Sequence, residues 1–195
     1  MEARDSNLKV FIAGSRRLSR LSGDVTRRID NILAKGFTIV VGDANGMDKA
    51  VQKYLRKQHY ERVLVYCMEG ACRNNEGGWK TREIQAPEAK RRDFAFFSTK
   101  DRAMAVEADY GLMLWDGESR GTLTSIVDLV RQGKPVLVYL APDRSFLTLK
   151  EPEDLAQLRG QLDSTALLRV DRELQLLTHP TVRVSGRERE TSSMF

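Results

Sequence analysis

Short apolar runs recur along the first 140 residues of the chain, and they do not alternate with polar residues. Runs of this kind, rich in valine, isoleucine and leucine, are typical of strands in a parallel sheet that is covered on both faces. We therefore predict five buried parallel strands, which are Val10–Ala13, Thr38–Val41, Val63–Cys67, Gly111–Trp115 and Val136–Leu140.

Segments with helical spacing separate these runs. Apolar residues recur three, four and seven positions apart within Leu123–Val130, which places them on one face of a helix. That helix has a defined end, because Gly133 suits a left-handed cap and Pro135 cannot continue a helix. Similar apolar stripes predict helices around Val25–Leu33 and Met47–Leu55.

Strands that alternate with helices imply right-handed crossover connections and a doubly wound α/β sheet. We expect a mainly parallel sheet of five or more strands over residues 1–142, with an insertion at 69–98 that is too long for a plain loop. Such an insertion is either a lid over a site or a surface elaboration. Residues 143–195 are expected to form a C-terminal helical extension, with one amphipathic helix at Glu153–Leu162. We expect the polar tail at 183–195 to be flexible.

Composition restricts the class of protein. The chain has 195 residues, of which 41% are apolar and 30% charged, as in a globular protein with one sizeable core. No apolar stretch is long enough to span a membrane, and the first residues lack a signal-peptide core, so we expect a cytoplasmic protein without a membrane partner. The formal charge of +5 favours anionic partners but does not separate nucleotides from nucleic acid.

The cysteines and histidines do not have the spacing of a metal site. Cys67 lies in a predicted strand and Cys72 in the loop that follows, and we interpret them as a core residue and a free loop thiol. The two histidines, His59 and His179, lie far apart in the sequence. We therefore expect no metal and no cofactor.

Three predicted strands run into loops that combine glycine with small polar or cationic residues. Ligands of open α/β sheets bind beyond the carboxyl ends of the strands, near the point where the strand order reverses. Glycine lets backbone amides approach an anion, hydroxyl groups donate hydrogen bonds, and arginine holds a phosphate through two donors. The loop residues that we predict to bind a ligand are Gly14, Ser15, Arg16, Gly42, Asn45, Gly46, Asp48, Ser119, Arg120, Gly121 and Thr122.

Each loop alone has a simpler interpretation as a tight turn before a capped helix. Asn45 and Asp48 have the spacing of a capping-box variant, which needs no ligand. Three such loops at one edge of a sheet nevertheless favour a ligand that contains phosphate, with Gly121-Thr122 at a helix N-terminus as the anion site. None of the loops is a Walker A loop or a GxGxxG fingerprint, so nucleoside triphosphate hydrolysis and dinucleotide redox chemistry are disfavoured.

The stretches GDANGMDKA (42–50), ADYGLMLWDGESRGTLTSI (108–126) and GKPVLVY (133–139) together resemble a known superfamily. It is the Rossmann-like superfamily, called SLOG, that unites the DNA-processing protein DprA, the Lonely guy phosphoribohydrolases and assorted nucleotide sensors. The chain is most similar to a bacterial branch with GxAxGxD and WDGxSRGT motifs, and the resemblance covers residues 8–141. It implies a modified Rossmann fold, a nucleotide-derived ligand whose phosphate lies on the Gly-Thr loop, and a homo-oligomer that pairs through helices of this domain.

The phosphoribohydrolases are also similar to the chain in the helix before the fourth predicted strand, where a basic pair precedes a methionine. Here that stretch contains Lys100, Arg102 and Met104. The resemblance makes Arg102 a candidate ligand-binding residue, with an exposed helix position as the alternative, whereas we interpret Met104 as a core residue. Trp115 and Trp79 are candidates for stacking on a base, with hydrophobic packing as the alternative.

One catalytic carboxylate of these hydrolases has no counterpart in the chain. They carry a glutamate three residues after the threonine of the Gly-Thr loop, where this chain has Ser125, and serine is not a general base at neutral pH. Asp116 and Glu118, in the loop itself, are the candidate catalytic substitutes, although a hydrogen bond to a ribose hydroxyl would also satisfy Asp116. We interpret Asp128, one helical turn further on, as an exposed helix residue.

Three functions therefore stay open. The first is a sensor or regulatory protein that binds a nucleotide or nucleotide-derived signal without catalysis. The second is an N-glycosidase that cleaves a nucleoside phosphate with a non-standard carboxylate and releases free base. The third is nucleic-acid binding of the DprA type, which the basic and aromatic run from Arg91 to Phe97 suggests, although packing of its three phenylalanines explains that run equally well. Nucleic-acid binding would show a steep loss of affinity with salt.

Overall fold

The computed structural model describes residues 8–70, 72–86, 93–160 and 168, and it is organised around a seven-stranded sheet. The strand order is β4-β3-β2-β1-β5-β6-β7, and all neighbouring strands are parallel except the last pair. The five predicted strands are present as β1 (Lys9–Gly14), β2 (Thr38–Gly42), β3 (Val63–Met68), β5 (Tyr110–Trp115) and β6 (Val136–Leu140).

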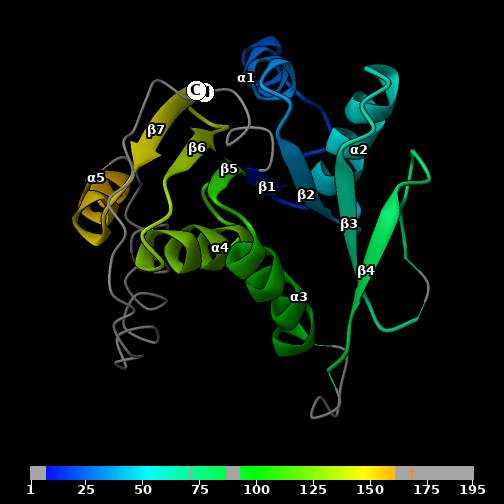
Figure 1. Cartoon of the computed structure of the whole chain (residues 1–195). Coiled ribbons are helices and arrows are strands. Elements are labelled where there is room, and N and C mark those ends of the chain that lie inside the picture. The colour runs from blue at the N-terminus through cyan, green and yellow to red at the C-terminus, as the bar shows by residue number, and fades with distance from the viewer. Residues whose placement is uncertain (1–7, 71, 87–92, 161–167, 169–195) are drawn as a thin grey trace.

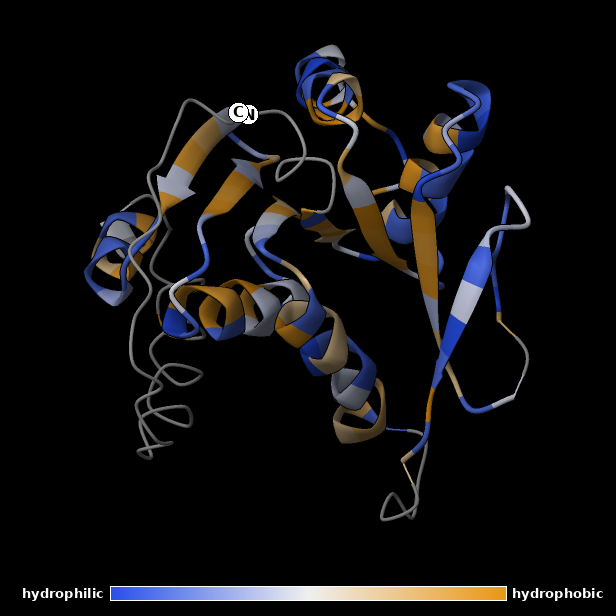
Figure 2. Cartoon of the chain, in the orientation of Figure 1, coloured by the Kyte–Doolittle hydropathy of each residue, from blue (hydrophilic) through white to orange (hydrophobic). Residues whose placement is uncertain are grey.

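Helices cover both faces of this sheet, which is why its strands are apolar on both sides (Figures 1 and 2). The apolar residues of α1 (Gly23–Ala34) and α2 (Met47–Lys57) pack on one face. Those of α3 (Phe94–Glu107) and α4 (Arg120–Arg131) pack on the other. The α/β fold with a mainly parallel, doubly wound sheet is therefore confirmed.

The strand order reverses between β1 and β5. From β1 the chain proceeds outward through β2, β3 and β4, then returns to pair β5 with the other side of β1. Helices that follow β1 and β5 leave toward opposite faces of the sheet, so the carboxyl ends of these two strands border a crevice. This is the part of the fold in which a ligand site is expected.

Two strands have no counterpart in the sequence prediction. The strand β4 (Lys80–Ile84) lies inside the insertion at 69–98 and pairs in parallel with β3. Its first four residues are exposed, so it has no apolar run, and it is largely hydrophilic in Figure 2. The strand β7 (Ser145–Leu149) pairs antiparallel with β6, so the segment after residue 142 begins inside the sheet.

The helix expected at 153–162 is present in part. A 3-10 turn, η2 (Pro152–Asp154), leads into α5 (Leu155–Gly160), which is shown in Figure 1. The end of that predicted helix and the tail at 183–195 lie outside the described residues. Within the described part of the chain, no helix combines the length and the apolar character that a membrane span requires.

Met104 provides a test of the packing of α3 on the sheet. The residue is 1% exposed and belongs to the core cluster that includes α4, which confirms the sequence interpretation. Met104→Ala is expected to lower the free energy of unfolding by about 2–5 kcal/mol, because it removes buried methylene groups and leaves a cavity. Val106, on the same helix, is 69% exposed, so Val106→Ala is the matched control. Equal urea midpoints for the two variants would contradict this placement of α3.

Candidate functional site

A pocket of about 520 Å³ opens at the carboxyl ends of β1 and β5, where the strand order reverses. Its described lining comes from the loops after β1, β2 and β5, the start of α2, Arg73 in the segment after β3, the N-terminal half of α3 and the first two turns of α4. Nine of the residues predicted from the sequence line it: Gly14, Arg16, Asp48, Asp116, Glu118, Ser119, Arg120, Gly121 and Thr122.

The loop after β5 is held by hydrogen bonds of its own. Asp116 Oδ1 accepts from the backbone amides of Glu118 (3.0 Å) and Ser119 (2.7 Å). Ser119 is the N-cap of α4, and its hydroxyl accepts from the amide of Thr122 at 3.5 Å. Other amides of a first helical turn have no partner within the helix and carry its partial positive charge. The start of α4 at Gly121 therefore brings the positive end of a helix to the pocket, which is an environment that favours anions.

Ser15 does not line the pocket but supports the loops around it. It is fully buried, and its hydroxyl accepts from the backbone amide of Asp116 at 3.1 Å. The same oxygen lies 3.5 Å from Thr122 Oγ1. Ser15 therefore ties the loop after β1 to the loop after β5 and fixes both sides of the crevice.

The entry to α2 differs from the predicted capping box. The N-cap of α2 is Gly46, at φ 86°, and it makes no side-chain cap hydrogen bond. A Cβ at this position would also overlap the Arg16 carbonyl oxygen, so only glycine fits. Asn45 Oδ1 accepts instead from Asn74 Nδ2 at 3.0 Å, and Asp48 Oδ2 accepts from the amide of Ala44 at 3.2 Å.

A buried ion cluster lies beside the pocket at the end of β2. Asp43 is 2% exposed and accepts from the Arg73 guanidinium at 2.7 and 3.1 Å and from the Arg73 amide at 3.1 Å. Lys100 Nζ, from α3, donates to Asp43 Oδ1 at 3.1 Å. Burial alone would raise the pKa of Asp43, but hydrogen bonds from Arg73 and the charge of Lys100 hold that pKa well below its usual range. The carboxylate therefore stays ionised.

Two further carboxyl groups, Asp48 and Asp101, line the pocket near this cluster. Burial raises the pKa of Asp48 to about 6, against the attraction of Lys100. Burial likewise raises the pKa of Asp101, with Lys100 again opposing it. Gly42 allows this convergence, because a Cβ there would overlap Asp48 Oδ2 and lie 2.6 Å from Lys100 Nζ.

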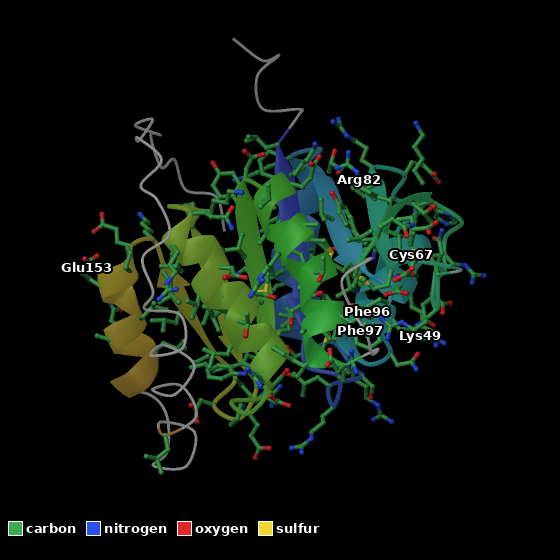
Figure 3. The ribbon with its side chains drawn as sticks, turned by 90° about the horizontal axis from the view of Figure 1, so that it is seen from below. Lys49, Cys67, Arg82, Phe96, Phe97 and Glu153 are labelled. Carbon is green, nitrogen blue, oxygen red and sulfur yellow. A yellow bond between two sulfur atoms is a disulfide. The ribbon has the colours of Figure 1, made fainter. Side chains whose placement is uncertain are left out.

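Arginines lie over two phenylalanine rings of α3 at the pocket. The guanidinium carbons of Arg16 and Arg73 lie 5.3 and 4.8 Å from the centroid of Phe97, which is labelled in Figure 3. The guanidinium carbon of Arg120 lies 4.1 Å from the centroid of Phe94. We call this set the arginine–phenylalanine rim. Cation–π contacts of this kind are worth about 0.5–1 kcal/mol at exposed sites. Arg73 is also held by Asp43, so a ligand would displace Arg16 or Arg120 more readily than Arg73.

Several sequence candidates do not line the pocket. Trp115 is 1% exposed, packs in the core and donates through Nε1 to the Ser119 carbonyl at 3.0 Å, so its ring is not available for stacking. Trp79 is 8% exposed and donates to the Tyr60 carbonyl at 2.9 Å. Ser15, Gly42, Asn45 and Gly46 support the surrounding loops from outside the lining.

Arg102 does not line the pocket. Its side chain is 66% exposed, and its Nε lies 4.0 Å from Asp128 Oδ2. The Asp128 side chain is only 19% exposed, which corrects the interpretation of this residue as an exposed helix position. The cation that α3 places in the pocket lining is Lys100, whose side chain is 3% exposed.

The face of α3 was predictable in principle. Phe97, Lys100, Asp101 and Met104 lie three, four and seven positions apart, which is the spacing of one helical face. Because Met104 is interpreted as a core residue, the same spacing predicts that Lys100 and Asp101 face inward. Arg73 had no comparable signal, because it lies in an insertion without periodicity.

The cysteines form a disulfide, Cys67–Cys72, which corrects the expectation of a free thiol at Cys72. The bridge joins the buried end of β3 to the residue that precedes Arg73. In the described part of the chain, no group of three or more histidine, cysteine, aspartate or glutamate side chains is arranged to hold a metal ion.

The fold is similar to that of the DNA processing protein A (DprA) of Helicobacter pylori, whose structure was described for its single-stranded DNA binding mode. The TM-score is 0.51 and the sequence identity 18%, over 86% of this chain and 80% of that chain. At this identity the likeness concerns the fold alone, and it agrees with the Rossmann-like architecture that the sequence motifs imply. No protein-family model and no curated protein matches the chain.

The buried carboxyl of Asp48 gives the stability of the protein a pH dependence. Its pKa of about 6 exceeds the ordinary value of 3.8, so between these pH values the folded chain binds more protons than the unfolded chain. The contribution of Asp48 to the free energy of unfolding therefore falls as the pH rises through this window. Asp48→Asn is expected to be more stable than the unchanged protein at pH 8, by at most about 3 kcal/mol.

Urea unfolding at several pH values between about 4 and 8 measures this effect, and the gain in Asp48→Asn should shrink toward the acidic end. Asp43→Asn is the control of opposite sign. The lowered pKa of Asp43 stabilises the fold at neutral pH, so this variant should be destabilised there. A destabilised Asp48→Asn at pH 8 would show that the Asp48 carboxylate is not a net cost to the fold.

Proposed function

We propose that the pocket binds a nucleotide or nucleotide-derived ligand through its phosphate, and that the protein acts as a sensor or regulatory protein. The observation that carries the proposal is the start of α4 at the point where the strand order reverses. Gly121 and Thr122 line the pocket there, beside the guanidinium groups of Arg16 and Arg120. A helix N-terminus and arginine side chains together form a strong environment for a phosphate.

The arginine–phenylalanine rim supports a ligand that also carries an aromatic base. The rings of Phe94 and Phe97 both line the pocket, and each already has a flat cationic group above it. A base can take the place of a guanidinium group on such a ring. The pocket of about 520 Å³ is also within the usual range for small-molecule sites.

Two substitutions in the first turn of α4 test the phosphate position. Arg120→Ala and Gly121→Ala are each expected to weaken the binding of nucleoside mono- or diphosphates by roughly tenfold or more, as measured by isothermal titration calorimetry. A Cβ at Gly121 would meet no heavy atom within 4 Å, so this substitution does not disturb the protein itself. Arg102→Ala is the matched control, because this exposed arginine does not line the pocket.

Unchanged affinity in both variants would remove the phosphate site from consideration. Chromatography of the same incubated samples separates binding from hydrolysis. Asp116 and Glu118 line the pocket, but Asp116 holds its own loop and Glu118 pairs with Arg17. A free-base peak that is absent with Arg120→Ala would establish the alternative, an N-glycosidase with an unusual carboxylate.

Single-stranded nucleic acid is the second candidate ligand. The fold likeness to DprA, a protein described for single-stranded DNA binding, favours it. The rim also combines aromatic rings with arginines, which is how sequence-independent sites hold single strands.

Fluorescence anisotropy with a single-stranded oligonucleotide at several salt concentrations tests this candidate. If Arg16 contacts a backbone phosphate, Arg16→Ala should reduce the slope of log K against log salt by about 0.7. Arg28, whose guanidinium lies over Phe146 and outside this pocket, is the control position for an alanine variant. Saturable mononucleotide binding together with weak, salt-insensitive oligonucleotide binding would reject nucleic acid in favour of the free nucleotide.

A further inference from the structure

Carboxyl groups are as numerous as cationic groups in the described lining of the pocket, and most of them are already used. Asp93 is the N-cap of α3, where it accepts from the amide of Phe96 at 3.2 Å. Asp116 holds its own loop, and Glu118 pairs with Arg17. These three groups have structural partners that explain their presence.

Asp48 is different because one of its oxygens has no such partner. The residue is 6% exposed, and among the described residues its single hydrogen bond joins Oδ2 to the Ala44 amide. No fully enclosed side-chain oxygen in the described part of the chain lacks a hydrogen bond. The unpartnered Oδ1 of Asp48 is therefore accessible, and Asp48 lines this pocket.

Asp101 adds a second carboxyl that makes no hydrogen bond to any described residue, and its side chain is 31% exposed. It lines the pocket, and its closest ionic neighbour is Lys100 Nζ at 3.9 Å. Asp101 comes from α3 and Asp48 from the first turn of α2, so two helices present acceptor oxygens to one cavity. Asp48 is buried, and a buried polar group needs a partner, which points to a hydrogen-bond donor on a ligand.

The charge around these carboxyl groups restricts the donor. Lys100 is buried within 3.9 Å of Asp101 and 3.1 Å of Asp43, so a cation is already present. A metal ion or an ammonium group would lie against that lysine and be repelled. Burial also raises the pKa of both Asp48 and Asp101. This disfavours a ligand group that binds only when both carboxyl groups are ionised. Neutral hydroxyl donors fit this environment, whatever the proton occupancy of the two carboxyl groups.

The position of these groups relative to the phosphate site identifies the hydroxyls. Gly14 lines the pocket between them: a Cβ there would lie 2.7 Å from Met47 Cγ on α2 and 2.5 Å from the Leu114 carbonyl of β5. Met47 precedes Asp48, and β5 leads into the loop before α4. The pocket therefore has a cationic helix end on one side of Gly14 and acceptor oxygens on the other. A nucleotide has the matching order, because its phosphate is attached to a sugar that carries hydroxyl groups.

We propose that Asp48 and Asp101 bind the ribose hydroxyls of the nucleotide, so that the pocket selects ribonucleotides over 2′-deoxyribonucleotides. This inference rests on the proposed nucleotide-binding function. Acidic side chains are a common partner of the ribose 2′-hydroxyl in dinucleotide-binding folds. Here the acid at the end of β2, Asp43, is occupied by Arg73 and Lys100. Asp48 and Asp101, whose side chains keep acceptor oxygens without a hydrogen bond to the described residues, are therefore the acids that bind the ribose hydroxyls.

The test compares the affinities of matched ribonucleoside and 2′-deoxyribonucleoside 5′-monophosphates by isothermal titration calorimetry. With the unchanged protein, the ribonucleotide should bind roughly tenfold more tightly, because the deoxy analogue leaves an acceptor oxygen without a donor. Asp48→Asn and Asp101→Asn keep the shape of each side chain but replace one acceptor oxygen by a donor group. Each should reduce this preference, while binding of the deoxyribonucleotide changes less.

Asp93→Asn is the matched control. It removes the same charge from the same pocket, and asparagine still caps a helix, so the preference should be unaltered. Equal affinities of the two sugars for the unchanged protein would overturn the inference and leave the nucleotide site intact. A preference that survives both Asp48→Asn and Asp101→Asn would also overturn it. Failure of every nucleotide to bind would instead reject the proposed function, and with it the inference.

Discussion

The architecture around the pocket depends on one buried carboxylate, Asp43. It joins the end of β2 to Arg73 and to Lys100, which lie 30 and 57 residues further along the chain. An ionised carboxylate that is 2% exposed is tolerated only when cations and hydrogen bonds replace its water. The two cations in turn set the position of the segment around Arg73 and the rotation of α3 about its axis. On the side of the pocket formed by the end of β2 and by α3, the lining therefore follows from the neutralisation of one buried charge.

The elements near the centre of the sheet could be predicted from sequence because local patterns determine them. The five inner strands are uninterrupted apolar runs, and the helices around them repeat apolar residues with helical spacing. The loop that we propose to hold a phosphate had an equally local signal, since Gly121-Thr122 follows a polar turn at the start of a helix. Strand ends of a parallel sheet meet at one edge, so these loops could be grouped without knowledge of the tertiary structure.

The remaining features depend on contacts between distant segments. Residues 80–84 read KTREI, which has neither apolar alternation nor an apolar run, and only pairing with β3 makes them a strand. Likewise Asn45 and Asp48 have the spacing of a helix cap, but Asn74 takes the side chain of Asn45 as its partner. The choice of Arg102 over Lys100 had a different cause. Arg102 was predicted from the family resemblance. The periodicity of the helix, with Met104 as a core residue, instead places Lys100 on the inward face.

The charged edge strand β4 has a consequence for the solubility of the sheet. An open sheet can grow by adding a strand from another molecule, and a flat apolar edge invites this. Here the outermost strand presents Lys80, Arg82 and Glu83 to solvent, with Arg82 (labelled in Figure 3) also bonded to Glu107 of α3. An added strand would have to desolvate these charges and compete for that contact. On this side of the sheet, the exposed charges of β4 therefore oppose amyloid-like growth by strand addition.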